Sequence, residues 1–309
     1  MLPYRDAPMR TLWNPMAANT KARWLLACVF AVLAFASFVG SAGAVPANAN
    51  YNRVINLAGK QRMLTQKMTK EFLLFALEVD QAKNLRSLRA TRNLFDRTLK
   101  GLRHGDLELG LPPTRKPSII KSLDKVKRLW SKFDAAISAT IRSGAIDGKQ
   151  FTSVARFNLP LLAAMDESVN SFEGDAKKRG VDPALATAIN ISGRQRMLTQ
   201  KMSKEFLFIV YGFEADKNRK RLNATVGFFE RALDGLLAGD AEMGLPPPPS
   251  KKIAAQLARV KRHWNSFLPL LAKVIEGSTV AASVVREVAA RNLSLLRAMN
   301  KTVNMYEAL

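Results

Sequence analysis

The sequence predicts an all-α protein: two tandem antiparallel four-helix bundles that follow an N-terminal signal peptide. Three observations lead to this prediction. Apolar residues recur at three- and four-residue spacing through long segments, with no strand-like alternation of apolar and polar residues. Clusters of glycine and proline break the chain between these segments. The same set of segments occurs twice, so the chain is a duplication.

The duplication is clearest in an eleven-residue stretch from Gly59, which recurs almost unchanged from Gly193, 134 residues later. Further matches have the same offset and no gap: Gly110-Leu111-Pro112-Pro113 with Gly244-Leu245-Pro246-Pro247, Trp130 with Trp264, and Asn158 with Asn292. The repeated unit of about 120 residues has the length of a small domain and is too long for a solenoid repeat. We therefore place one domain at residues 50–180 and a second at residues 181–309.

Four helices are predicted in each repeat, separated by glycine and proline. In the first repeat they span 51–80, 82–103, 117–142 and 149–178, and in the second 184–214, 216–238, 251–276 and 279–307. At the junction of the repeats, Asp182 is expected to cap the next helix and Pro183 to be its first residue. Trp130 and Trp264 lie on the third helix of each repeat, where we interpret them as core residues.

Residues 1–49 have the features of a secretory signal peptide, so we expect a periplasmic protein. Lys21 and Arg23 precede an apolar run, and small residues with the A-x-A pattern follow at Ala42-Gly43-Ala44 and again at Ala47-Asn48-Ala49. An uncleaved membrane anchor is the alternative. The one cysteine, Cys28, lies within the apolar run, so we expect no disulfide, no metal site and no cofactor in the exported part.

The formal net charge of +23 favours anionic partners, such as small anions, acidic protein surfaces or anionic lipid. The basic residues are scattered and accompany no nucleic-acid motif, so we expect no nucleic-acid partner. No catalytic set with usable spacing appears, so an enzyme is not expected. The recurring acids Glu108 and Glu242 are interpreted as loop residues.

The first helix of each repeat has two distinctive faces. The core face of the first copy contains Leu57, Leu64, Met68, Phe72, Phe75 and Val79. The opposite face contains Ile55, Ala58, Gly59, Arg62, Gln66, Thr69, Leu73 and Ala76 in the first copy, and Ile189, Ser192, Gly193, Arg196, Gln200, Ser203, Leu207 and Val210 in the second. Small residues on this second face allow another backbone to come close, which is unusual for a solvated surface.

Arg62 and Arg196 on this second face are candidate anion ligands. An arginine beside a small-residue contact surface is costly unless its charge is met, and a planar guanidinium suits a planar oxyanion. Two such helices packed face to face would bring the two arginines to one shared anion. The alternatives are that each arginine is solvated, caps backbone carbonyls or pairs with an acid elsewhere in the bundle.

The motif from Ile55 to Gln66, Ile-Asn-Leu-Ala-Gly-Lys-Gln-Arg-Met-Leu-Thr-Gln, and its copy from Ile189 resemble the opening helix of PilJ-type domains. These domains are the N-terminal ligand-sensing region of type IV pili methyl-accepting chemotaxis transducers. The I-N-x-A-G-x-x-R-M core also resembles the P-box of periplasmic nitrate/nitrite sensor kinases. In those sensors the P-box arginines of two subunits bind one anion at the dimer interface.

The resemblance implies that Arg62 and Arg196 bind a small oxyanion, nitrate or nitrite, with Gly59 and Gly193 as close-approach positions. On residue chemistry, the expected site also includes Gln66, Gln200, Thr69 and Ser203.

No HAMP, kinase or methyl-accepting region follows in the sequence, so we expect a sensor-like module without its own signalling domain. It would present its state to a membrane signalling protein. The alternative is a periplasmic interaction module linked to type IV pili or chemotaxis, with pilin among its candidate partners. Whether the tandem repeats replace a homodimer, and the oligomeric state, are left open.

Overall fold

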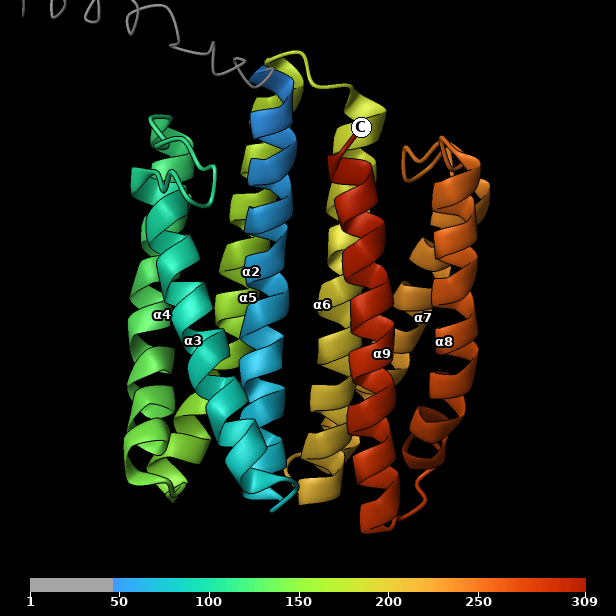
Figure 1. The fold of residues 1–309 in the computed structure, drawn as a ribbon. Coiled ribbons are helices and arrows are strands. Elements are labelled where there is room, and N and C mark those ends of the chain that lie inside the picture. The colour runs from blue at the N-terminus through green and yellow to red at the C-terminus, as the bar shows by residue number, and fades with distance from the viewer. Residues whose placement is uncertain (1–46) are drawn as a thin grey trace, which may run out of the picture. The chain divides into compact units, whose positions relative to one another are not determined.

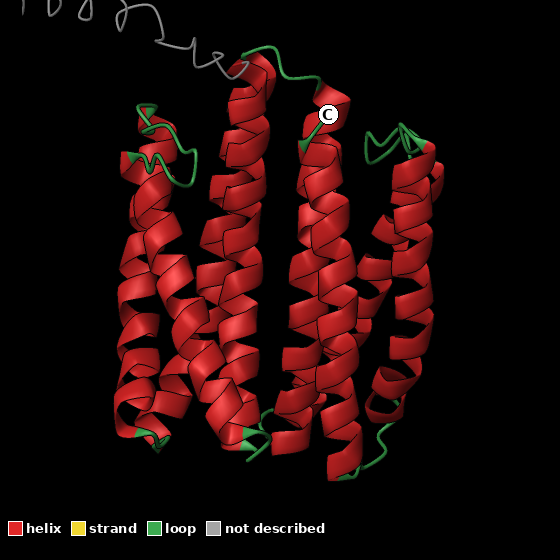
Figure 2. Ribbon diagram, viewed as in Figure 1, coloured by secondary structure: helices red, strands yellow, loops and turns green. Residues whose placement is uncertain are grey.

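The computed structural model describes residues 47–309, which fold into eight α-helices without a β-strand (Figures 1 and 2). These residues lie within one compact unit, residues 45–309. The all-α prediction is confirmed. The signal peptide predicted for residues 1–49 lies almost wholly outside the described residues, and the division into domains at residue 180 stays a prediction.

The helices agree closely with the predicted segments. In the first repeat they are α2 (Ala47–Ala76), α3 (Gln81–His104), α4 (Pro117–Ser143) and α5 (Gly148–Lys178). In the second repeat they are α6 (Pro183–Tyr211), α7 (Ala215–Ala238), α8 (Lys251–Ile275) and α9 (Ala282–Glu307). At the junction, the Asp182 side chain accepts a hydrogen bond from the Ala184 backbone N–H at 2.9 Å, and Pro183 is the first residue of α6. Both predictions for these residues are confirmed.

The first helix of each repeat ends earlier than predicted. In the second repeat, Gly212 adopts a φ of 81° and ends α6, because a left-handed residue stops the helix and glycine adopts that conformation without steric cost. In the first repeat the same position is Glu78, with a φ of 57°. The helical periodicity continues through this turn, since Val79 is still buried in the core, and for that reason the sequence pattern gave a longer helix.

Each repeat is a ring of four antiparallel helices. In the first repeat α2 and α4 both pack against α3 and α5, and in the second α6 and α8 both pack against α7 and α9 (Figure 1). Short connections between successive helices account for this up-and-down order. Trp130 and Trp264 are buried, as predicted, and their indole N–H groups donate to Asp96 at 3.1 Å and to Glu230 at 3.2 Å.

The two rings meet along α2 and α6, which form the most extensive helix pair in the described structure. The connection from α5 to α6 returns the chain to the end of the molecule where α2 begins, so α2 and α6 run in the same direction (Figure 1). The contact buries the second face of both helices, including Ala58, Gly59 and Ser192. The prediction that this is not a solvated face is confirmed.

Within residues 47–309 no helix combines the length and the apolar character needed to cross a membrane.

Trp264 should be a main contributor to stability, because its fully buried ring packs on Phe229 with ring centroids 4.5 Å apart. We expect Trp264→Ala to lower the free energy of unfolding by about 3–5 kcal/mol. Phe228→Ala is the matched control, since that ring is 67% exposed, and should change it by less than about 0.5 kcal/mol. Urea unfolding followed by circular dichroism measures both. Equal effects of the two substitutions would contradict the core assignment.

Candidate functional site

The α2–α6 contact brings the two motif arginines together. Arg62 on α2 is 0% exposed and Arg196 on α6 is 2% exposed. A Cβ atom on Gly59 would lie 3.4 Å from Nη2 of Arg62 and 3.6 Å from Nη2 of Arg196. A Cβ atom on Gly193 would lie 3.3 Å from Nη2 of Arg196 and 3.6 Å from Nη2 of Arg62. The Nη2 atoms of both arginines therefore lie beside both glycines, at one level of the α2–α6 contact.

Arg62 has a well-defined set of acceptors. Its Nη1 donates to the Asp166 carboxylate on α5 at 2.6 Å, and its Nη2 donates to the side-chain oxygen of Asn190 at 2.7 Å and the backbone carbonyl at 3.1 Å. Burial lowers the pKa of Arg62, and Asp166 partly offsets that effect. Of the alternatives drawn from the sequence, pairing with an acid elsewhere in the bundle holds for Arg62.

Arg196 contacts no carboxylate in the described structure. Its Nη2 donates to the backbone carbonyl of Asn56 at 3.1 Å. Burial, followed by repulsion from Arg62, lowers the pKa of Arg196 to about 9, and Glu307 offsets this only in part. The Nε of both arginines is buried and has no hydrogen-bond partner among the described residues. Both guanidinium groups are buried, so solvation is excluded for either, and of the alternatives drawn from the sequence the bond to a backbone carbonyl holds for Arg196.

The difference between the two arginines comes from one position on α5 and α9. The repeat offset aligns Asp166 of α5 with Asn300 of α9, so the second repeat has an amide where the first has a carboxylate. Part of the surrounding pattern is reciprocal, because each arginine donates to the backbone carbonyl of the asparagine at the same motif position of the other repeat. Among the described residues, only Arg62 also bonds to the side chain of that asparagine. The charge imbalance is therefore built into the sequence at this single position.

The remaining predicted site residues form a separate buried layer. The amide nitrogen of Gln66 donates to Thr65 at 3.0 Å, and that of Gln200 donates to Asn292 at 2.9 Å. The hydroxyl groups of Thr69 and Ser203 donate to backbone carbonyls of their own helices at 3.2 and 3.4 Å. The structure therefore brings the arginines and glycines together, while none of these four polar side chains hydrogen-bonds to either guanidinium group within residues 47–309.

Sequence reasoning missed a layer of lysines that crosses the α2–α6 contact. Lys70 donates to Asn292 at 2.9 Å, and Lys204 donates to Asn158 at 3.1 Å, so each lysine bonds to the other repeat. Burial lowers the pKa of Lys70 to about 8 and that of Lys204 to about 7. The sequence did contain a signal for these lysines, because both copies of the repeat have lysine at this position.

Asp166 and Asn190 were also missed by sequence reasoning. For Asp166 the repeat gives no signal, because the matching residue of the second copy is different.

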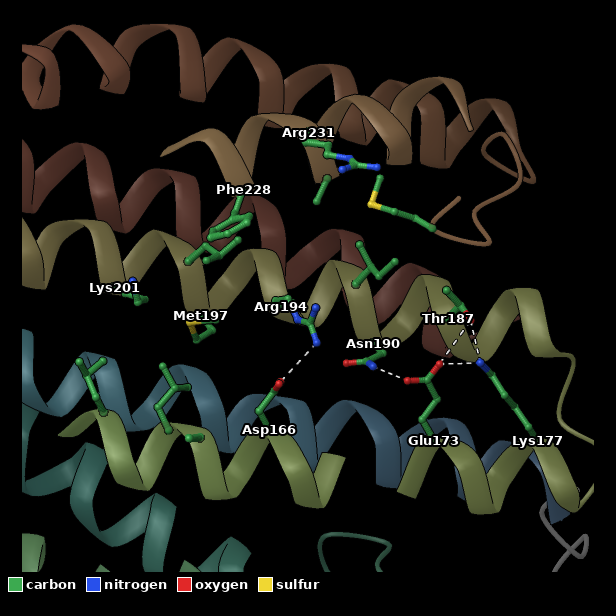
Figure 3. A pocket seen from close by; sticks show the side chains of 17 residues that line it. Asp166, Glu173, Lys177, Thr187, Asn190, Arg194, Met197, Lys201, Phe228 and Arg231 are labelled. Carbon is green, nitrogen blue, oxygen red and sulfur yellow. Dashed lines mark hydrogen bonds and ion pairs between the residues drawn. The ribbon is translucent and has the colours of Figure 1, made fainter. Parts of the chain in front are cut away.

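A groove of about 890 Å³ between α5, α6 and α7 reaches the partners of Arg62 (Figure 3). Its walls include Asp166, Asn190 and Arg194, and the exposed ring of Phe228 lies on the α7 side. Arg194 donates to the Asp166 carboxylate at 3.4 Å, so this carboxylate contacts one buried and one accessible arginine. The loop acids Glu108 and Glu242 each pair with an exposed arginine, Arg97 and Arg231 respectively, and Arg231 also lines this groove.

The fold and the repeated arginine–glycine helix define a tandem module of two four-helix bundles. Residues 47–152 and 184–288 each match the family model described as "Type IV pili methyl-accepting chemotaxis transducer N-term", the PilJ family. The two matches cover more than half of the chain, so the chain belongs to this family and carries two copies of its domain. The resemblance to PilJ-type domains inferred from the motif is confirmed.

One relative has a name that links it to the same process. Over 120 residues the chain is 32% identical to the methyl-accepting chemotaxis protein McpN of Pseudomonas aeruginosa. The match covers 39% of this chain and 22% of McpN, so the chain spans only a small part of that relative's length. Both matches relate the chain to methyl-accepting chemotaxis transducers.

The buried lysine layer predicts a pH-dependent stability. Because the pKa of Lys204 falls from 10.5 to about 7 on folding, the unfolded chain binds more protons between these values. The contribution of Lys204 to the free energy of unfolding therefore rises with pH from about 7 to 10.5. Lys204→Met removes this titration. We expect the variant to exceed the wild type by on the order of a few kcal/mol at pH 7, with the difference shrinking towards pH 10.

Urea unfolding at a series of pH values measures this difference. Lys217→Met serves as control, because that lysine is exposed beside Glu214 and its loss should leave the pH profile in place. Parallel profiles for wild type and Lys204→Met would contradict the assignment of the pH dependence to Lys204.

Proposed function

We propose that this protein is a periplasmic sensor-like module of the chemotaxis type that binds one small planar oxyanion, nitrate or nitrite, between Arg62 and Arg196. The two repeats take the place of two subunits, each contributing one arginine to a shared site. The bound or free state is then presented to a membrane signalling protein. The family membership supports the sensing role, and the resemblance of the motif to the P-box supports the choice of anion.

The observation that carries the proposal is the buried guanidinium of Arg196, which contacts no carboxylate and lies beside a second buried guanidinium. A buried charge costs free energy unless a partner compensates it, and two like charges in one space add repulsion. One monovalent anion between the two groups would give Arg196 a partner and would reduce the repulsion between the two guanidinium groups. The lowered pKa of Arg196 has these same two causes.

The shape of the site favours a small planar anion. A guanidinium presents parallel N–H donors that match two oxygens in one plane. The Nε atoms of both arginines are without partners, so each arginine has a free donor beside its occupied ones. A Cβ atom at Gly59 or Gly193 would lie only 3.3–3.6 Å from the Nη2 atoms of both arginines, which favours a small ligand over a larger one.

A second candidate function is a protein-interaction module linked to chemotaxis or type IV pili. The names of the family and of the relative favour this role without naming a ligand. The groove along α5, α6 and α7, with the exposed ring of Phe228 on its α7 side, is the surface that suits it. In that case the arginines would be packing residues, and a protein partner would bind equally well after either is replaced.

Anion binding should raise the melting temperature of the protein selectively. At constant ionic strength we expect nitrate or nitrite, but not chloride or sulfate, to stabilise the fold, by about 2.7 kcal/mol at one hundred times the dissociation constant. Arg196→Met should abolish this response, and it should leave the melting temperature without ligand unchanged or higher, because it removes a buried unpaired charge. Differential scanning calorimetry measures both effects.

Arg231→Met is the matched control, since it removes the same charge from an exposed position that pairs with Glu242. A selective response to nitrate that persists in Arg196→Met would contradict the shared arginine site. The absence of any selective response in the wild type would favour the interaction module.

Gly59→Ala should separate folding from binding. The added Cβ would lie 3.4 Å or more from the guanidinium groups, an ordinary contact, so the fold is expected to tolerate it. Alanine in place of glycine within a helix should raise stability by about 0.5–1 kcal/mol. The methyl group nevertheless fills the space between the arginines, so the nitrate response should fall. Gly227→Ala on α7, where a Cβ meets nothing within 4 Å, should stabilise without loss of binding. An unchanged nitrate response in Gly59→Ala would place the anion elsewhere.

A further inference from the structure

Asp166 connects the buried arginines with the accessible groove. Its carboxylate accepts hydrogen bonds from buried Arg62 at 2.6 Å and from half-buried Arg194 at 3.4 Å. Its side chain is 37% exposed, so it contacts solvent as well. Figure 3 shows Asp166 on α5 facing Arg194 on α6 across the groove. One carboxylate thus belongs to both the proposed anion site and the surface beside it.

The matching positions of the other repeat do not reproduce this pairing of a carboxylate with two arginines. The repeat offset replaces Asp166 by Asn300 on α9 and Arg194 by Lys60 on α2. The motif helices are otherwise nearly identical, and Asn300 lies half-buried on the helix that packs against α6, as Asp166 does on the helix that packs against α2. Arg62 and Arg196 therefore lie in similar helical surroundings, but only the surroundings of Arg62 include a carboxylate at this position.

A carboxylate and nitrate present the same chemistry to a guanidinium, because both are planar and offer two oxygens to parallel N–H donors. Asp166 occupies Nη1 of Arg62, while Asn190 occupies Nη2. An anion that binds Arg62 through its Nη1 edge therefore competes with Asp166, whereas no carboxylate among the described residues contacts Arg196.

We propose that Asp166 is a built-in competitor of the ligand: it neutralises Arg62 in the empty protein and is displaced from it when an oxyanion binds between the two arginines. This inference rests on the proposed function. The displaced carboxylate stays beside Arg194 at the groove wall, so occupancy of the buried site changes the charge pattern of the groove. Asp166 is thus a positioning residue: it lowers the affinity of the site for the anion, and its displacement makes the groove surface respond to whether the anion is bound.

The proposal can be tested by exchanging the residues at positions 166 and 300 between the two repeats. The affinity for nitrate is then measured by isothermal titration calorimetry. Asp166→Asn copies the second repeat and should tighten nitrate binding about tenfold, because a charge-assisted hydrogen bond no longer has to be broken. Asn300→Asp copies the first repeat and should weaken binding about tenfold by giving Arg196 a carboxylate of its own. The double variant restores one carboxylate per two arginines, and its affinity should return to within about threefold of wild type.

Glu167→Gln is the matched control for net charge. It removes one negative charge at the neighbouring position of α5, where Glu167 is exposed and pairs with Lys125. Its affinity for nitrate should stay within about twofold of wild type, since exposed charges are screened by salt. Circular dichroism of each variant verifies the fold, and the Asn300→Asp and double variants keep the test decisive if Asp166→Asn is unstable.

The outcomes separate the two proposals. If wild type binds nitrate through Arg196 but Asp166→Asn and Asn300→Asp both bind with wild-type affinity, Asp166 is only a structural partner of Arg62, and this inference is overturned alone. If Glu167→Gln tightens binding as much as Asp166→Asn, the effect is one of net charge, and the inference also fails. If neither wild type nor any variant binds nitrate or nitrite, the proposed function fails, and the inference fails with it.

Discussion

The parallel contact of α2 with α6 is the constraint on which the rest of the structure depends. Each helix is buried on both faces, one against its own bundle and one against its counterpart. Glycine in each helix leaves room for the guanidinium groups, since a Cβ atom there would lie 3.3–3.6 Å from the Nη2 atoms of both arginines. The two glycines and the two guanidinium groups therefore meet at one level of the contact.

The contact is unusual because its interior is polar and positively charged. Two arginines and two lysines are almost fully buried there, and asparagine side chains or backbone carbonyls of the opposite repeat accept their hydrogen bonds. Burying unpaired charge opposes stability, so such residues are more easily explained by a ligand or by a coupling between the repeats than by packing alone. The lysines bond each repeat to an asparagine of the other repeat. Of the two arginines, Arg62 pairs with a carboxylate, whereas Arg196 bonds to a backbone carbonyl.

Fusion of two domains in one chain allows the two sides of their interface to differ in sequence, which a symmetric dimer does not allow. In a homodimer the two sides of the interface must be identical, whereas here Asp166 and Asn300 differ although they occupy matching positions. The asymmetry distinguishes the two arginines, because Arg62 pairs with Asp166 whereas Arg196 contacts no carboxylate among the described residues. Asp166 also lines the groove beside Phe228, so the Arg62–Asp166 pair lies next to an accessible surface.

The sequence by itself determined the helices, the duplication and the family, because these depend on local signals: apolar periodicity, glycine and proline breaks, and a motif repeated at a fixed offset. It also identified Arg62, Arg196, Gly59 and Gly193 as a unit, since their spacing on one helix face is a local property. The tertiary structure alone decided that the two motif helices pack against each other, that Gln66 and Thr69 bond elsewhere, and that Asp166 pairs with Arg62 from 104 residues away. Helix spacing carries no information about which side chain of a distant helix arrives at a given point. Asp166 could not be found from the repeat either, because it lies where the two copies differ.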